Sequence, residues 1–217
     1  SYLMALTKFN FNSFDVTTVA STGLAFNSSA NGFDTAAAGS LNLIATNTIS
    51  SGVSSSDFTS GIDSTYDTYV FKLINIHVAN DGSEFRMNFR DGGSSFDATK
   101  TSTCFQASHQ ESGGSTSFGY ETGFDLANGT ADQTIVRNIG NASDESLSGT
   151  IFLFSPSSTT FVKHFISDTQ TVISSNQTDR CFVAGYCNVT AAIDGITFKP
   201  DSGNIDSGVI KMYGLTK

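Results

Sequence analysis

Apolar and polar residues alternate strictly on both sides of a short polar turn, and this pattern constrains the fold more than any other. In "TYVFKLINIHV" (68–78) and "EFRMNFR" (84–90) apolar residues recur at every second position. Alternate side chains of a β-strand point to opposite faces, so each segment predicts a half-buried strand. "NDGS" (80–83) between them has the composition of a turn, with Gly82 free to take positive φ. The two segments therefore predict a hairpin, with Phe85, Met87 and Phe89 facing inward and Arg86, Asn88 and Arg90 outward.

The parity of the first of these segments changes part-way along it. Tyr69, Phe71 and Leu73 share one face, whereas Ile74, Ile76 and Val78 take the other parity. Such a change predicts a β-bulge or a strand that is buried on both faces.

Further segments of the same kind continue to the end of the sequence. No stretch keeps the i, i+3, i+4, i+7 spacing of an amphipathic helix beyond two turns, so little helix is expected. About eight short strands with polar turns and many aromatic residues favour an all-β fold, an antiparallel β-sandwich of the jelly-roll type. The later predicted strands are "TSTCFQASH", "GTIFLFS", "TTFVKHFIS", "RCFVAGYC", "GITFKP" and "GVIKMYGL".

The composition bears on the class of protein. Charged residues make up 14% of the 217 residues, against roughly 25% in ordinary soluble domains. The formal charge is −9, and the 11 Lys and Arg are scattered singly, which argues against nucleic-acid binding. No apolar run reaches the length of a membrane-spanning helix, and no apolar segment of a signal peptide follows Lys8, so neither membrane insertion nor secretion is expected.

Three cysteines do not make a complete disulfide framework. Cys181 and Cys187 lie in one predicted strand, where their separation is about 20 Å at ~3.3 Å per residue, too far for a disulfide. Buried thiols in a protein made in a reducing cytoplasm are the expectation, and no C-x-x-C motif indicates a metal site.

The first 60 residues differ from the rest of the sequence. They carry only four charged residues but many Ser, Thr, Ala, Asn and Gly, with short alternating segments such as "KFNF" and "LNLI". The Ser/Gly-rich segment 50–61 predicts a boundary, so residues 1–60 are interpreted as an extended N-terminal arm and residues 61–217 as the sandwich. The candidate assembly contacts of this arm are Phe9, Phe11, Phe14, Leu24 and Phe26.

Few residues point to catalysis or to metal binding. His109 lies close to Glu111, but no second histidine is near in sequence, so a polar surface residue is the simpler interpretation. Asp63, Asp67 and Asp91 are interpreted as turn residues rather than as a pair of catalytic carboxylates. "DSGNIDSG" (201–208) lacks the spacing of a calcium loop and predicts a turn. No enzymatic activity, cofactor or metal is therefore expected.

The segment "ESGGSTSFGYETG" (111–123) is the best candidate for ligand contact. Phe118, Tyr120 and Glu121 lie there among Gly and Ser, and aromatic rings with hydroxyl groups are what a sugar- or receptor-binding tip would use. The alternative is a long hairpin loop whose aromatic side chains fold back onto the sheet.

Several segments resemble a module of virion proteins from marine tailed bacteriophages of cyanobacteria and pelagic bacteria. They are, in order, "IDSTYDTYVFKLINI", "SSTTFVKHFIS", "CFVAGY" and "AAIDGITFKPDSGNIDSGVIKMYGL", and they extend over residues 61–217. The resemblance implies a non-enzymatic structural protein of the virion surface, either a capsid decoration protein or a component of a head or tail fibre.

In this interpretation the N-terminal arm holds the protein on its neighbours. The expected partners are further copies of the chain in a homotrimer, a major capsid or tail protein, and a host surface glycan. The protein would be made in the host cytoplasm and located in the virion. The alternative function is a lectin-like, carbohydrate- or receptor-binding module of a tail fibre. A glycan depolymerase or esterase is a third class, which no sequence feature supports.

Overall fold

The computed structural model describes residues 22–26, 33–37 and 41–215, and the chain divides into two compact units, Ser1–Ser40 and Leu41–Lys217. In the smaller unit β1 (Thr22–Phe26) pairs antiparallel with β2 (Phe33–Ala37), so that Phe26 lies opposite Phe33. The candidate contacts Leu24 and Phe26 thus belong to β1, whereas Phe9, Phe11 and Phe14 lie outside the described residues.

All the regular secondary structure in the described part of the larger unit is β-strand. No helix long and apolar enough to cross a membrane occurs among the described residues. The strands of this unit are β3 (Leu41–Ile49), β4 (Ser56–Phe58), β5 (Thr68–Val78), β6 (Ser83–Arg90), β7 (Lys100–Gln110), β8 (Thr116–Tyr120), β9 (Gln133–Ile139), β10 (Leu147–Phe154), β11 (Lys163–Ile173), β12 (Gln177–Cys187), β13 (Gly195–Pro200) and β14 (Ile205–Leu215).

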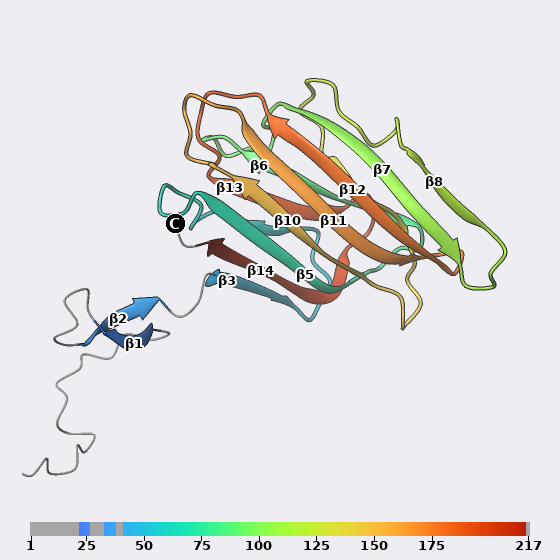
Figure 1. Ribbon diagram of the computed structural model, residues 1–217. Helices are drawn as coiled ribbons and strands as arrows, with labels where there is room; N and C mark the ends of the chain where they lie inside the picture. The colour runs from blue at the N-terminus through green and yellow to red at the C-terminus, as the bar shows by residue number, and fades with distance from the viewer. Residues whose placement is uncertain (1–21, 27–32, 38–40, 216–217) are drawn as a thin grey trace, which may run out of the picture. The chain divides into compact units, whose positions relative to one another are not determined.

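These strands form two layers of one antiparallel sheet. The order β3-β14-β5-β10-β11-β12-β7-β8 makes an eight-stranded layer, and β9-β6-β13-β4 makes a four-stranded layer. Figure 1 shows β6 and β13 behind β10, β11 and β12. The two layers are joined where Ile173 of β11 pairs with Ile139 of β9. The prediction of an all-β antiparallel fold is confirmed.

The opposite side of the sheet is closed by a side chain. Asn47 of β3 donates to Ser56 Oγ (3.0 Å) and to the main-chain oxygen of Asp57 (3.2 Å), both in β4. The strands from β3 through β11 and β9 to β4 therefore form a nearly closed, barrel-like sheet, and β12, β7 and β8 extend from β11 beyond it.

The segment that follows β8 continues along the edge of β7. The main-chain N–H of Ser102 on β7 donates to the carbonyl oxygen of Leu126, and the N–H of Leu126 donates back to Ser102 Oγ, each at 2.9 Å. Gln133 at the start of β9 donates to the carbonyl oxygen of Phe124 at 2.7 Å. Residues 121–132 thus take the place that a further strand would occupy.

Aromatic rings fill the space between the two layers. Phe71 of β5 contacts Phe58 of β4 and Phe198 of β13, with ring centroids 5.7 and 5.8 Å apart. Phe89 of β6 contacts Phe165 of β11 at 5.2 Å. Each of these contacts joins a strand of one layer to a strand of the other, and all five rings are buried. The alternation predicted for β5 and β6 therefore defines the core.

The predicted hairpin of β5 and β6 is wrong. β5 pairs with β10 on one edge and with β14 on the other, and β6 pairs with β9 and β13. Both edges of β5 are occupied, so the turn at 80–83 carries the chain from one layer to the other instead of pairing the two strands. Gly82 has φ 73° as expected of this turn.

The change of parity in β5 marks a bulge. Asn75 has φ 48°, and the register of β5 shifts against both neighbours in this region, between Leu147 and Gly149 on β10 and around Ser207 on β14. Leu73 and Ile76 are three positions apart and so have opposite parity, yet both are buried, while Ile74 between them is exposed. One of the two predicted explanations, the bulge, is therefore the observed one.

The larger unit begins before the boundary predicted near residue 60. β3 pairs with β14 along most of its length, Val53 bridges to Ile205, and β4 pairs with β13. Phe58 is buried in the aromatic core. The Ser/Gly-rich segment 50–61 thus consists of β4 and the short connections on either side of it. The division between the two units falls between Ser40 and Leu41.

The three cysteines are free and buried. Cys104 of β7 and Cys181 of β12 lie with their Sγ atoms 3.4 Å apart, and Cys187 lies farther along β12. Burial raises the pKa of the Cys187 thiol to about 12. The expectation that Cys181 and Cys187 do not form a disulfide is confirmed.

Replacing Phe71 by alanine tests the interlayer aromatic core. We expect the Phe71→Ala change to lower the free energy of unfolding by about 3–5 kcal/mol, because it leaves a cavity between the layers. The matched control is Phe161→Ala, which removes an equal side chain that is 74% exposed and is expected to change stability by no more than about 0.5 kcal/mol. Urea denaturation measures both, and equal losses for the two variants would contradict the assigned core.

The thiols give a second test of the fold. At pH 8 we expect N-ethylmaleimide to leave all three cysteines of the native chain unmodified over minutes, because the thiols are buried and the reactive thiolate of Cys187 is disfavoured. The same reagent in 8 M urea, roughly the usual denaturing concentration, should modify all three. Mass spectrometry counts the adducts, and rapid labelling of Cys187 in the native chain would contradict its burial.

Candidate functional site

The outer face of the β12-β7-β8 extension carries a group of aromatic side chains, which we call the aromatic strip: Phe105, Phe118, Tyr120 and Phe182. The strands place them by register, since Phe182 of β12 lies opposite Phe105 of β7, and Phe105 lies opposite Tyr120 of β8. The alternation "TCFQAS" and "RCFVAG" buries the cysteines and leaves the phenylalanines on the outer face. The strip therefore follows from strand periodicity together with the pairing of three strands.

The rings of the strip contact one another. Phe105 and Phe182 are stacked with centroids 4.9 Å apart and planes 18° from parallel. Phe118 meets the edge of Phe105 at 5.8 Å. Phe118 is 76% exposed, Tyr120 is 52% exposed and Phe105 is 39% exposed. These rings offer apolar faces to solvent, which is the arrangement used to stack on a flat apolar group or on the apolar face of a sugar.

An ion pair borders the strip at β12. Arg180 lies over the ring of Phe182, with Cζ 4.6 Å from the centroid, and binds both carboxylate oxygens of Asp168 on β11, at 2.9 and 2.6 Å. The hydrogen bond that Arg180 donates to Asp168 raises the pKa of Arg180. The guanidinium is thus held over the aromatic ring, with donors still facing solvent.

A second polar group borders the strip at β8. Tyr120 Oη donates to Asp125 Oδ2 at 2.6 Å, and this hydrogen bond raises the pKa of Tyr120. Glu121 accepts a hydrogen bond from Gln106 Nε2 at 2.7 Å. Carboxylates at both ends of an exposed aromatic surface provide hydrogen-bond acceptors beside stacking rings, a combination suited to hydroxyl-bearing ligands.

The strip continues along β12 and β7 into a shallow depression of about 390 Å³. Its walls come from β11, β12 and β7, and His164 and Tyr186 meet there edge to face at 6.2 Å. Thr101, Ile166 and Ala184 also line it. The aromatic strip and the depression together make one exposed surface that crosses β11, β12, β7 and β8.

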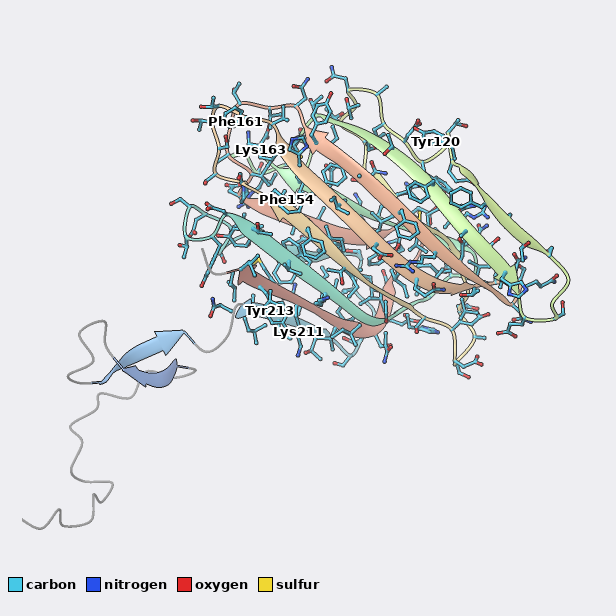
Figure 2. The ribbon with its side chains drawn as sticks, in the orientation of Figure 1. Tyr120, Phe154, Phe161, Lys163, Lys211 and Tyr213 are labelled. Carbon is cyan, nitrogen blue, oxygen red and sulfur yellow. The ribbon has the colours of Figure 1, made fainter. Side chains whose placement is uncertain are left out.

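β8 adds main-chain groups to this surface. Within the described residues β8 pairs with β7 alone, and its residues are exposed or half-buried. Its outer edge therefore presents main-chain N–H and C=O groups, which an added strand from a partner would bind. Figure 2 shows Tyr120 at this end of the layer, far across the view from Phe161.

The structure brings the predicted ligand-contact residues together in an unexpected setting. Phe118 and Tyr120 belong to β8, a strand that the sequence did not predict, and Glu121 directly follows it. Their rings face solvent and do not fold back onto the core. Phe105, Phe182 and Arg180 were missed as site residues; the alternation in "TCFQAS" and "RCFVAG" is the signal that could have placed them on the outward face.

The other polar candidates are explained by local structure. Hydrogen bonds from the Thr65 side chain, from the Thr65 main-chain N–H (2.7 Å) and from Tyr69 Oη (3.1 Å) lower the pKa of Asp63 and hold a turn. His164 is exposed on β11, and His109 is exposed near the end of β7. The described residues contain no group of three or more His, Cys, Asp or Glu side chains placed to hold a metal ion.

Comparison of the chain with protein-family models, with curated proteins and with solved structures finds no match. The aromatic strip, the depression beside it and the free edge of β8 are therefore the basis on which function is proposed.

Proposed function

We propose that this chain is a non-enzymatic structural protein of a tailed-bacteriophage virion, a surface component of the capsid decoration or fibre type. The resemblance of residues 61–217 to virion modules of marine phages supports the class of protein. The observation that carries the proposal is the aromatic strip, an exposed binding surface on a rigid antiparallel layer.

The division of the chain supports an anchoring role for its N-terminal part. Residues 1–40 form a unit of their own, with three charged residues and many Phe, Leu and Ala. A segment of this composition gains stability by burying its apolar side chains against a neighbour. The proposed partners are other copies of the chain and a major capsid or tail protein, and the larger unit projects from them.

The strip favours a second function that is compatible with the first, binding of a host surface glycan. Stacked rings flanked by Asp125, Asp168 and Arg180 combine apolar faces with hydrogen-bonding groups. Sugars present an apolar face and a rim of hydroxyl groups, so they fit both features. In a fibre this surface would be the receptor-binding part.

Solution mass tests the anchoring role. We expect light scattering to give a trimer for the full chain and a folded monomer for a chain that begins at Leu41, because the first 40 residues hold the assembly contacts. Circular dichroism checks that the shorter chain keeps its strands. A trimer that persists without residues 1–40 would place the interface in the larger unit, and two monomers would remove self-association from the proposal.

Glycan binding tests the role of the strip. We expect Phe118→Ala to weaken binding to host surface polysaccharide by about tenfold or more, since an exposed stacking ring contributes on the order of 1–2 kcal/mol. Phe161→Ala is the matched control, because Phe161 is exposed to nearly the same extent (74% against 76%) but lies away from the strip. Calorimetric titration measures both variants. Equal affinity of Phe118→Ala and the unchanged protein would exclude the strip as the glycan site.

A further inference from the structure

Two lysines are fully buried in the larger unit, and they lie in one row across three strands. Lys163 of β11 is opposite Cys187 of β12, and Cys187 is opposite Lys100 of β7. Neither lysine has any exposed surface. A buried ammonium group is costly unless it is paired with a carboxylate, so the contacts of each lysine indicate what it does.

The contacts of the two lysines differ. Lys163 Nζ donates to the carbonyl oxygen of Val189 at 2.6 Å. Lys100 Nζ donates to the carbonyl oxygen of Ala98 at 2.7 Å and to the side-chain oxygen Oδ1 of Asn88 at 2.6 Å. Lys100 therefore places a primary amine against the carboxamide of a buried asparagine, which Lys163 does not.

Asn88 is held by four hydrogen bonds in a defined orientation. Its Oδ1 accepts from Lys100 Nζ and from the main-chain N–H of Phe89 at 2.8 Å. Its Nδ2 donates to Asp132 Oδ1 at 3.0 Å and to the carbonyl oxygen of Thr130 at 3.1 Å. Asn88 on β6 is thus in contact with two other reactive groups. Its carboxamide oxygen accepts from the amine of Lys100, at the start of β7, and its nitrogen donates to the carboxylate of Asp132, just before β9.

We propose that Lys100 and Asn88 form an intramolecular isopeptide bond, with Asp132 as the catalytic carboxylate. The neutral Nζ of Lys100 attacks Cγ of Asn88, and a new N–C bond forms. The negative charge that develops on Oδ1 is stabilised by the N–H of Phe89. One proton passes from Nζ through the carboxylate of Asp132 to Nδ2, the Cγ–Nδ2 bond breaks, and ammonia leaves.

The step balances without any other reactant. A primary amine and a primary amide give a secondary amide and ammonia, no atom is oxidised or reduced, and Asp132 ends in its starting state. The folded protein accelerates the reaction, because it holds Nζ of Lys100 2.6 Å from the side-chain oxygen of Asn88 and excludes water from the amine.

The electrostatic surroundings favour the reaction. Burial lowers the pKa of Lys100 to about 8, although the fields of Cys187, Asp132, Asp97 and Asp91 act in the opposite direction. Burial by itself raises the pKa of Asp132, but hydrogen bonds from Lys199 and Asn88 outweigh it and leave the pKa below its ordinary value. Near neutral pH a fraction of the Lys100 amine is therefore neutral, while the Asp132 carboxylate is ionised and can accept a proton.

The proposed bond joins the two layers. Asn88 belongs to β6 in the four-stranded layer and Lys100 belongs to β7 in the eight-stranded layer. The bond closes the loop 91–99 covalently at the place where the β12-β7-β8 extension begins to leave the barrel-like part of the sheet.

The intact mass of the purified full chain tests the proposal without any substitution. We expect a mass about 17 Da below that of the sequence, the mass of one ammonia molecule, after denaturation in acid. Trypsin cuts after Lys and Arg, so an unreacted chain gives separate peptides 87–90, 91–100 and 101–137. The bonded chain gives one branched species in which 87–90 is attached to 91–137. An unchanged mass, or a loss of ammonia without the branched species, overturns the proposal.

Variants assign the roles of the three residues. Lys100→Arg keeps a positive charge without the nucleophilic amine and should give the full sequence mass. Asn88→Asp should still form the bond but lose water, about 18 Da, instead of ammonia. When chains recovered unfolded in urea, before they have reacted, are refolded, Asp132→Asn should form the bond more slowly than the unchanged chain, because the proton carrier is gone. Lys163→Arg is the matched control, a buried lysine without an amide partner, and should keep the mass loss of the unchanged chain.

The pH dependence separates this chemistry from other losses of ammonia. Only the neutral amine attacks, so the rate should fall roughly tenfold for each pH unit below 8 when chain that was recovered unfolded in urea, before it had reacted, is refolded. The rate is followed by intact mass at pH 6, 7 and 8, values that bracket roughly the titration of the amine. A rate that does not change over this range would contradict attack by Lys100.

Discussion

The contact between the rings of Phe58, Phe71 and Phe198 is the interaction on which the rest of this structure depends. The three rings come from β4, β5 and β13, so they fasten the four-stranded layer to the middle of the eight-stranded layer. Between β11 and β9 the strand register contains one residue pair, Ile173 with Ile139, and main-chain hydrogen bonds from Gly140 to Val172 and from Ser174 to Asn138 lie beside it. Burial of large aromatic side chains adds to this short main-chain connection in holding the sheet in its nearly closed form.

The burial of a strand face and the pairing of that strand with its neighbours are specified differently by the sequence, and this explains which predictions were confirmed. Alternation reports which face of a strand is buried, and Phe71, Phe85 and Phe89 are buried as their parity predicts. Alternation says nothing about which strand lies alongside. β5 and β6 were predicted to pair because a good turn joins them, yet both edges of β5 are taken by β10 and β14, which come later in the sequence. Pairing between distant segments depends on side-chain packing across the layers, which local pattern does not encode.

The candidate site shows the same limit. Phe118, Tyr120 and Glu121 were found from their aromatic and polar composition, but Phe105 and Phe182 join them only because β7 pairs with both β8 and β12. Asn88 is the opposite case. Its parity predicted an outward-facing side chain, and this prediction is wrong: Asn88 is buried, and the segment that holds Thr130 and Asp132 contacts it. Burial by a connecting segment leaves no periodic signal in the sequence, so a buried polar cluster of this kind is visible only in the structure.

β7 connects the two functional proposals physically. Lys100 lies at its first residue, in the row with Cys187 and Lys163, and Phe105 lies farther along the same strand in the aromatic strip. The extension formed by β12, β7 and β8 has a free edge at β8 and is attached to the barrel-like part through β11. A ligand that pulls on the strip would transmit the force to β7 and to the hydrogen bonds between β7 and β12. Hydrogen bonds of this kind break one after another when a strand is peeled from its neighbour. A covalent bond between Lys100 and Asn88 would pass that load directly to β6 and the aromatic core. A surface protein that must hold its ligand under force gains most from a bond at this position, at the root of the strand that carries the binding surface.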